Sequence, residues 1–175
     1  ASNRLYEIDQ QPALALYKKY LGKHAAQLPA SALLFPLAVR NNDNNDLLVR
    51  TILSIDPEEG SMLFAGDIPE GAPVRFMKAN FDKLVEAVSE ASQELQQKLG
   101  NNPAPAVALL ISCVGRKMIL NKRIDEEIEA VREVMGPNVP VMGFYSYGEL
   151  SPFSQAITCG LHNQTMTITT LSETD

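Results

Sequence analysis

Residues with reactive or charged side chains follow directly after two apolar segments in the second half of the chain. They are a thiol, a guanidinium, two phenols and a carboxylate: Cys113, Arg116, Tyr145, Tyr147 and Glu149. Ligands of open α/β sheets bind beyond the carboxyl ends of strands, so this placement predicts a binding site. The opposite charges of Arg116 and Glu149 match the two ends of an amino acid. We therefore expect a small zwitterionic or anionic ligand.

Arg116 and Glu149 each allow a second interpretation. A guanidinium binds a ligand carboxylate through two parallel hydrogen bonds, a geometry that lysine cannot match. The same geometry serves a structural ion pair, formed by Arg116 with Glu149 itself or by Glu149 with Arg50. Direct contact between the two charges would favour the structural interpretation, and a gap lined by both would favour a ligand.

Cys113 is interpreted either as a reactive thiol or as a small buried residue. A reactive thiol needs a pKa lowered by nearby positive charge, which Arg116 would supply. Free cysteine is among the most buried residue types, so the structural interpretation is favoured. Cys113, His162 and Glu149 also include the residue types of a thiol-dependent enzyme, whose parts often lie far apart in sequence.

Tyr145 and Tyr147 would share one face of the second strand if that strand continues far enough. Two tyrosines so placed either line a pocket or simply pack. His162 and Asn163 fall in a predicted turn near the end of the chain. A neutral histidine nitrogen can ligate a haem iron, although a turn histidine is usually polar surface. Asn163 is interpreted either as a ligand contact or, in preference, as the residue that adopts the left-handed backbone of that turn. Neither a metal-binding spacing nor a phosphate-binding loop is present, so no cofactor is expected from the residues themselves.

A strand–helix–strand unit positions these residues. Ala106–Ile111 is a continuous apolar run, the pattern of a strand buried on both faces, and Val139–Phe144 is a second apolar strand. Ile124–Met135 lies between them and repeats apolar residues at spacings of three and four, which predicts a helix. Its acidic residues, Glu127 among them, are predicted to face solvent. The short joints predict two parallel strands with a right-handed crossover.

The rest of the chain is predicted to add two helices and several short strands. One helix runs over Gln10–Leu21 with Asp9 as its N-cap, and the other runs to about Leu99 with Asn80 as its N-cap. The other strands are expected at Leu5–Ile8, Ala32–Arg40, Leu47–Asp56, Ser61–Gly66, Val74–Lys78, Gln155–Gly160 and Gln164–Leu171. Pro57 and Gly60 are typical turn residues, so Leu47–Asp56 and Ser61–Gly66 are predicted to form a hairpin. The predicted fold class is α+β, a mixed and mostly antiparallel sheet with about three helices and one βαβ unit.

Composition excludes several functional classes. The 175 residues are 45% apolar and carry a net charge of −6. The acidic balance disfavours nucleic acid as a partner, because phosphate binding needs a basic face. No apolar run approaches the length of about 20 residues that spans a bilayer, and no signal peptide is apparent. The two cysteines form no disulfide framework, so we expect a cytoplasmic protein in which Cys113 and Cys159 are not bonded.

Three segments resemble signatures of the C-terminal region of FIST domains, named for F-box and intracellular signal transduction proteins. They are Ser112–Arg116 (SCVGR), Gly143–Glu149 (GFYSYGE) and Leu161–Thr165 (LHNQT). Supporting similarity extends back through Gly60–Gly71 and Phe35-Pro36-Leu37 to Leu5. The resemblance covers nearly the whole chain in the right order.

This resemblance implies that residues 1–175 form a single domain of the FIST C-terminal type, excised from a longer sensory protein. The implied function is a small-ligand-binding input domain for intracellular signal transduction, with an amino acid among the ligands proposed for the family, and not an enzyme. Some relatives bind haem and sense nitric oxide, so a haem-based nitric-oxide sensor is one alternative, and a thiol-dependent enzyme using Cys113 is another. The implied partners are the missing N-terminal FIST region and a downstream signalling domain or protein. The resemblance carries over no catalytic residues.

Overall fold

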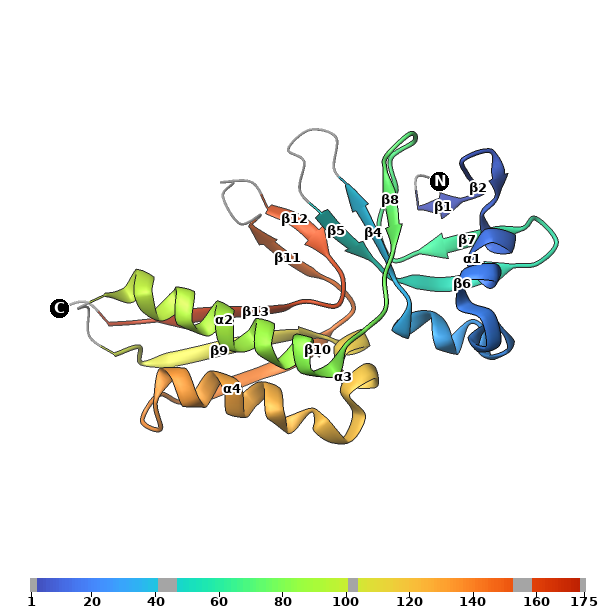
Figure 1. Cartoon of the computed structure of the whole chain (residues 1–175). Helices are drawn as coiled ribbons and strands as arrows, with labels where there is room; N and C mark the ends of the chain where they lie inside the picture. The colour runs from blue at the N-terminus through green and yellow to red at the C-terminus, as the bar shows by residue number, and fades with distance from the viewer. Residues whose placement is uncertain (1–2, 41–46, 101–103, 153–158, 174–175) are drawn as a thin grey trace. The chain divides into compact units, whose positions relative to one another are not determined.

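The two continuous apolar runs form neighbouring parallel strands, as predicted. The computed structural model describes residues 3–40, 47–100, 104–152 and 159–173. In it β9 (Val107–Cys113) pairs in parallel with β10 (Val141–Ser146), and α4 (Asp125–Met135) connects them along the chain. The prediction of a βαβ unit is confirmed. β13 (Met166–Leu171) pairs antiparallel with the other edge of β9, which gives a mixed three-stranded sheet (Figure 1).

Contacts divide the chain into two compact units, which are described separately. Unit 1 comprises residues 1–79 and 150–163, and unit 2 comprises residues 80–149 and 164–175. Several small sheets, mostly antiparallel, and four α-helices make up the described residues, together with the one mixed sheet. The α+β class is therefore confirmed. That residues 1–175 act as one domain of a longer sensory protein stays a prediction.

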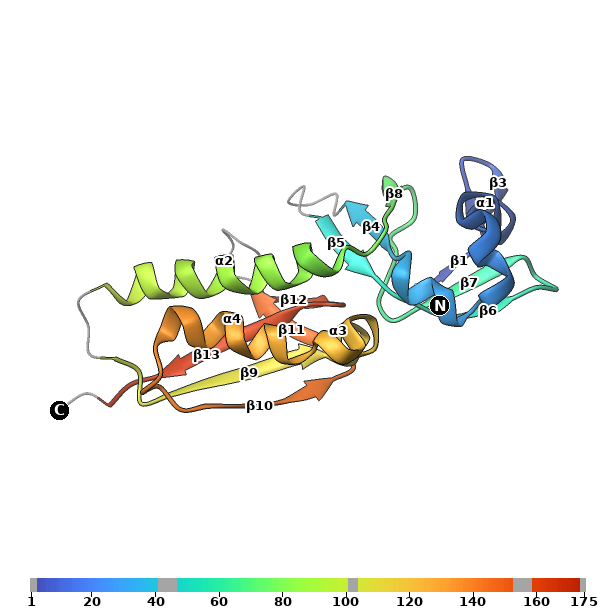
Figure 2. The same cartoon turned by 60° about the horizontal axis from the view of Figure 1, so that its bottom comes forward.

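Two helices cover one face of the sheet in unit 2. Figure 2 shows α2 (Phe81–Leu99) and α4 lying together on the same side of the strands. Leu110 of β9 packs there against Val88 of α2 and Val131 of α4. The prediction that Asn80 caps α2 is confirmed, because its side-chain oxygen accepts a hydrogen bond from the backbone N–H of Lys83 at 3.1 Å.

A fourth helix, absent from the prediction, begins directly after β9. This helix, α3 (Val114–Leu120), covers a segment that was interpreted only as the polar end of the strand. Seven residues give too short an apolar pattern to indicate a helix, and a glycine within it lowers helix propensity. The helix then passes into the short 3₁₀ helix η3 (Asn121–Arg123) before α4.

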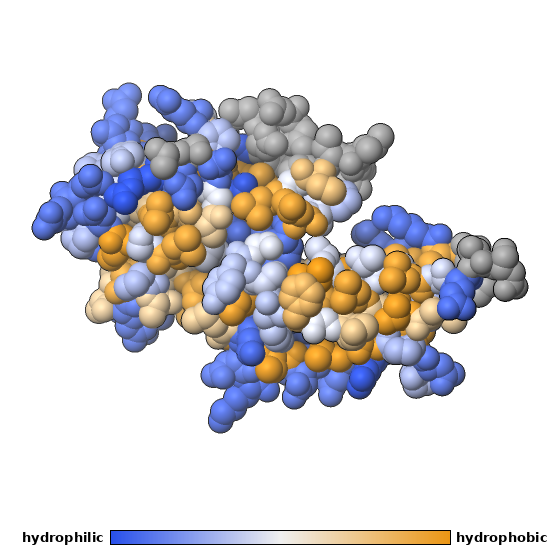
Figure 3. Space-filling model, turned by 180° about the vertical axis from the view of Figure 1, so that it is seen from behind, coloured by the Kyte–Doolittle hydropathy of each residue, from blue (hydrophilic) through white to orange (hydrophobic). Residues whose placement is uncertain are grey.

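The opposite face of the unit 2 sheet carries apolar side chains that no described helix covers. Side chains alternate between the faces of a strand, so the residues neighbouring the covered ones point the other way. This open sheet face comprises Val107, Leu109, Ile111, Met142, Phe144, Thr167, Thr169 and Leu171. Met142 and Phe144 keep 62% and 60% of their surface exposed. Figure 3 shows apolar side chains spread over this face. Val107, Leu109 and Ile111 are only half-buried, so the expectation that the first strand is buried on both faces is wrong.

Unit 1 is built from short antiparallel pairs around one core. Its elements are β1 (Arg4–Leu5), β2 (Glu7–Ile8), β3 (Gln11–Pro12), α1 (Ala13–Leu21), η1 (Gly22–Gln27), η2 (Ala30–Leu34), β4 (Leu37–Arg40), β5 (Leu47–Arg50), β6 (Ile52–Asp56), β7 (Ser61–Phe64), β8 (Val74–Phe76) and β12 (Cys159–His162), with most of β11 (Glu149–Pro152). The predicted hairpin is confirmed as β6–β7. Tyr17 and Phe64 lie at the centre of the core, and the Tyr17 hydroxyl donates to the carbonyl of Phe35 at 2.7 Å.

Two boundaries in unit 1 differ from the predictions. The first helix begins at Ala13, because Asp9 and Gln10 have positive φ values of 49° and 63° and turn the chain between β2 and β3. Asp9 is therefore not its cap. The strand expected over Ala32–Arg40 is limited to Leu37–Arg40, since Ala30–Leu34 is a 3₁₀ helix and Pro36 precedes the strand. Most of the strand expected at Gln155–Gly160 lies outside the described residues.

Candidate functional site

Arg116 is engaged by protein groups on every side of its guanidinium. It is 4% exposed, and its Nε donates to Glu127 Oε1 at 2.6 Å. Its other two nitrogens donate to the carbonyls of Gln164 at 3.3 Å and Leu84 at 2.9 Å. The guanidinium thus connects α3, α2, α4 and the segment before β13. Of the two interpretations of Arg116, this geometry favours the structural ion pair, with Glu127 in the place where Glu149 was expected.

Glu127 was predicted to face solvent, and that prediction is wrong. The residue is fully buried, and its Oε2 has no hydrogen-bond partner among the described residues. A buried carboxylate is tolerated where a cation lies against it, which Arg116 provides. The sequence gives no local signal for this, because the helical pattern around Glu127 is that of a solvent-facing acidic stripe.

The two tyrosines do not share a face. β10 ends at Ser146, one residue before Tyr147, whose side chain is 88% exposed. Tyr145 is half-buried beside α3, with the Lys117 Nζ 4.8 Å from the centre of its ring. Burial raises the pKa of Tyr145, and the negative charges of Glu127 and Asp125 add to the rise. Tyr145 therefore lies in the electrostatic field of the Arg116–Glu127 pair, whereas Tyr147 points to water.

Glu149 is a buried carboxylate bound by hydroxyl groups. It is 2% exposed, and it accepts hydrogen bonds from the Ser146 hydroxyl at 2.5 Å and the Thr165 hydroxyl at 2.8 Å. Ser146 lies opposite Cys113 in the parallel pairing, so this cluster lies at the carboxyl ends of β9 and β10. The position is the one predicted for a ligand site. Ser146 belongs to the segment Gly143–Glu149 and Thr165 to the segment Leu161–Thr165. Their place in these two FIST-like segments is the sequence signal that could have identified them.

Cys113 is placed as a structural residue. It is 5% exposed, and its backbone N–H donates to the carbonyl of Thr165 at 2.9 Å. Burial raises the pKa of the Cys113 thiol, and the charge of Glu149 also raises it, against the lowering effect of nearby backbone N–H groups. A nucleophilic thiol needs the opposite shift. Cys113 and Cys159 are both free thiols.

Two of the residues interpreted as ligand contacts belong to unit 1. Asn163 is 1% exposed; its Oδ1 accepts from the backbone N–H of Thr51 at 3.3 Å, and its Nδ2 donates to the carbonyl of His162. The residue with left-handed backbone is Gln164, at a φ of 56°, not Asn163 as expected. The Asn163 side chain therefore links the residue after β12 to the segment that follows β5 by a hydrogen bond.

Arg50 performs a similar task in unit 1. It is 5% exposed and donates to the carbonyls of Asp67 at 2.8 Å and Leu161 at 2.9 Å. A side chain added at Gly66 would come within 3.0 Å of its Nε. Arg50 is thus held by backbone oxygens and is not the partner of Glu149 that the sequence allowed.

His162, the residue considered as a haem ligand, lies beside a backbone carbonyl. Its Nε2 is 3.3 Å from the carbonyl oxygen of Ser151. The cavity described below, in unit 1, has no histidine in its lining. Among the described residues, no group of three or more His, Cys, Asp and Glu side chains is arranged to hold a metal ion.

Comparison with protein families decides what kind of chain this is. The model of the FIST C domain matches residues 13–152, well over half of the sequence. The chain belongs to the FIST C domain family. Neither the curated proteins nor the solved structures contain a match. None of the helices in the described part of the chain has the length and apolar character needed to cross a membrane.

The FIST C match includes five of the candidate site residues. Cys113, Arg116, Tyr145, Tyr147 and Glu149 lie inside the matched range, whereas His162 and Asn163 lie beyond it. FIST C domains are sensory domains associated with signalling. The resemblance found in the sequence is therefore confirmed at the level of the family, and the coarse functional class follows from it.

Proposed function

We propose that this FIST C domain is a small-ligand-binding input domain of intracellular signal transduction, and that its ligand is a small zwitterionic or anionic molecule such as an amino acid. The observation that carries the proposal is the buried, hydroxyl-bound carboxylate of Glu149 at the ends of β9 and β10. A desolvated carboxylate is a strong acceptor for a ligand ammonium group. Occupancy would act on a signalling partner by favouring one conformation over another.

The residues at these strand ends would divide the work. Glu149 would accept hydrogen bonds from the ligand amine, and Lys117 beside the half-buried Tyr145 would meet its carboxylate. Arg116, bound on all sides by protein, would hold the framework of the site. Cys113 would pack behind Glu149. The exposed Tyr147 would contribute from the rim, and His162 and Asn163 would support the segment of unit 1 that leads to Gln164.

The alternatives receive less support. A thiol-dependent enzyme needs an accessible cysteine of lowered pKa, and Cys113 is buried with a raised one. A haem-based sensor rests on His162 alone, and its Nε2 lies beside the Ser151 carbonyl.

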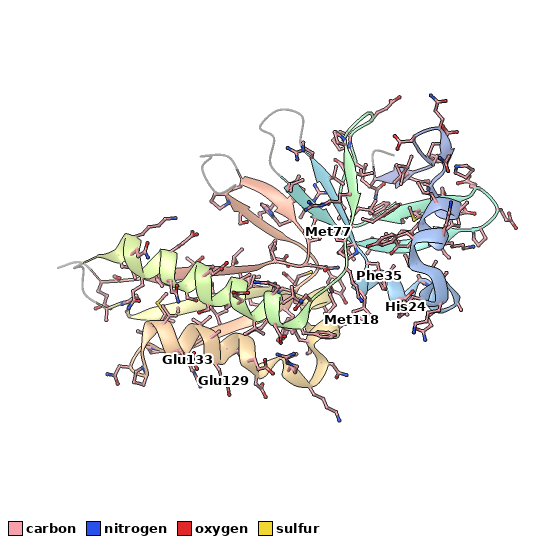
Figure 4. All side chains as sticks on the ribbon, in the orientation of Figure 1. His24, Phe35, Met77, Met118, Glu129 and Glu133 are labelled. Carbon is pink, nitrogen blue, oxygen red and sulfur yellow. The ribbon has the colours of Figure 1, made fainter. Side chains whose placement is uncertain are left out.

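Replacing Glu149 with glutamine is expected to weaken binding of the cognate amino acid at least tenfold, because a charged hydrogen bond contributes about 1.5–3 kcal/mol. The measurement is calorimetric titration of the twenty amino acids against the protein. Glu129→Gln is the matched control, since Glu129 projects from the exposed side of α4 (Figure 4) and loses the same charge. Equal affinity in the Glu149 variant, or no binding of any amino acid, would rule out this ligand and this anchor.

The partner we propose for this chain is an N-terminal FIST region, whose existence the name of the C domain implies. The open sheet face supports such a partner. It contains no charged residue, and three of its apolar side chains, those of Met142, Phe144 and Leu171, are each more than half exposed. Exposed apolar patches on folded domains mark interaction surfaces.

Phe144→Ser is expected to weaken association of this chain with its N-terminal FIST region by about 2 kcal/mol, the transfer free energy of one large apolar side chain. The two parts would be expressed separately and their Kd measured by calorimetry. Lys117→Ser, on the opposite side of the sheet among the helices, serves as the control for a general effect of substitution. Unchanged affinity for Phe144→Ser would show that the partner packs elsewhere.

A further inference from the structure

Unit 1 contains a cavity of about 1050 Å³ that the function proposed above does not use. Two segments line it, residues 4–10 and residues 68–74. Small-molecule sites occupy roughly 300–1,000 Å³, so this space is large enough for a ligand with room for water. It lies entirely within unit 1 and is separate from the strand ends of unit 2.

Backbone hydrogen bonds hold both walls of the cavity in place. On one side β1 pairs with β7, and the carbonyl of Tyr6 accepts from the N–H of Ala13 at 2.8 Å. On the other side the N–H of Ala72 donates to the carbonyl of Pro69 at 3.1 Å, which closes a turn. Gly71 supplies the positive φ of 74° that this turn requires. Both segments that line the cavity, residues 4–10 and 68–74, are thus held by backbone hydrogen bonds.

The cavity has an apolar floor and a polar rim. Leu5, Ile8, Ala72 and Val74 pack against the core of unit 1 from beneath, with Ile68 buried among them. On the rim, Tyr6 keeps 53% of its surface exposed and so offers an aromatic ring to a ligand. A floor of this kind stabilises the apolar part of a ligand by removing it from water.

The charges on the rim are uncompensated carboxylates. Glu7, Asp9 and Glu70 line the cavity, and none of them forms an ion pair or a side-chain hydrogen bond with another described residue. Arg4 also lines it, but its guanidinium is bound to Glu59 at 2.7 Å and Asp56 at 3.3 Å, neither of which belongs to the lining. The rim therefore attracts positive charge.

We propose that this cavity binds an organic cation, an amine whose ammonium group lies among Glu7, Asp9 and Glu70 and whose apolar part rests on the floor at Ile8 and Val74. An ammonium group can donate to several carboxylates at once, and it is also attracted to the face of an aromatic ring such as that of Tyr6. The acidic rim repels anionic molecules, so the site selects against phosphates and dicarboxylates.

The test uses phenethylamine and spermidine as probes of the 175-residue chain, with 2-phenylethanol as a neutral analogue of the first. Binding is followed by ¹⁵N–¹H NMR. Both amines are expected to shift the amide signals of residues 4–10 and 68–74 saturably, and the alcohol is expected to bind more weakly. The shifts should diminish as salt is added, because exposed charges are screened. No saturable change in these segments with either amine at millimolar concentration would overturn the proposal.

A charge-matched pair of variants separates a site from general attraction to an acidic protein. The triple variant Glu7→Gln, Asp9→Asn, Glu70→Gln removes the rim charges, and asparagine keeps the preference of position 9 for left-handed backbone. It is expected to bind each amine about tenfold more weakly, since three exposed ion pairs are lost. The control variant Glu90→Gln, Glu129→Gln, Glu133→Gln removes three exposed carboxylates from α2 and α4. If both triple variants bound the amines equally weakly, the effect would be one of net charge, and the proposed site would be ruled out. The amide shifts of residues 4–10 and 68–74 are read apart from those of residues 107–113 and 141–149, so failure of the amino-acid proposal leaves this result unaffected.

Discussion

Replacing Arg116 with alanine is expected to lower the free energy of unfolding by about 3–5 kcal/mol, the loss typical of breaking a buried ion pair from one side. The substitution leaves the carboxylate of Glu127, which is fully buried, without a cation, and one of its oxygens already has no partner among the described residues. The carbonyls of Leu84 and Gln164 also lose the hydrogen bonds that Arg116 donates to them. Urea unfolding followed by circular dichroism measures the loss.

Two further variants show whether the pairing is the cause. Arg123→Ala removes a 40%-exposed side chain that also forms ion pairs, with Asp82 and Glu126, and should cost less than about 1 kcal/mol. The double variant Arg116→Met with Glu127→Leu removes both charges and keeps apolar volume, so it should recover most of the loss. If Arg116→Ala were no more destabilising than Arg123→Ala, the pair would not be an important contact of unit 2.

The burial of Glu127 marks where sequence reasoning reaches its limit. Of the apolar residues that repeat at spacings of three and four in α4, Val131 is fully buried as expected, whereas Ile128 is 37% exposed. The periodicity could not distinguish Glu127 from its exposed neighbours, because the sequence of one helix does not show that a cation from another helix will lie against it. Arg116 and Glu127 lie 11 residues apart with α3 and η3 intervening. Their contact depends on a helix that was itself too short to predict.

Strand pairing, by contrast, followed from local pattern. The continuous apolar character of β9 and β10 and the helical stripe between them were sufficient to predict two parallel neighbours. The solvent exposure of the strands could not be predicted from this pattern, because a continuous apolar run fits a strand buried on two faces and also a strand with one face open. Met142 and Phe144 lie on the open sheet face. What covers a sheet is a property of the whole assembly of elements and not of the strand.

The candidate site was predicted in place but not in detail. Glu149 and Cys113 do lie together at the carboxyl ends of the strands, as the rule for α/β sheets indicates. The partner of each charge depended on contacts across unit 2 that no spacing reveals. Tyr147 was predicted to share a strand face with Tyr145, which requires the strand to include Tyr147. β10 ends one residue earlier, at Ser146.

Gly143→Ala is expected to destabilise unit 2 by about 3 kcal/mol, at the upper end of the usual cost of overpacking. Gly143 lies opposite Leu110 in the parallel pair, and a Cβ at this position would come within 1.9 Å of the Leu110 carbonyl oxygen and 2.8 Å of its carbonyl carbon. Both atoms are backbone, so no side-chain rotation relieves the overlap. β10 would have to move away from β9, which weakens the ladder hydrogen bonds between them.

The measurement is thermal unfolding together with amide hydrogen exchange, read separately for the two units. Tm of unit 2 is expected to fall by about 6–12 °C, given roughly 2–4 °C per kcal/mol for proteins of this size. Faster exchange should be concentrated in residues 107–113 and 141–146. Met142→Ala, one residue earlier, shortens a side chain that is 62% exposed and should change Tm by less than about 3 °C. A Gly143 variant as stable as this control would mean that the two strands have room for a methyl group between them, contrary to the close approach described.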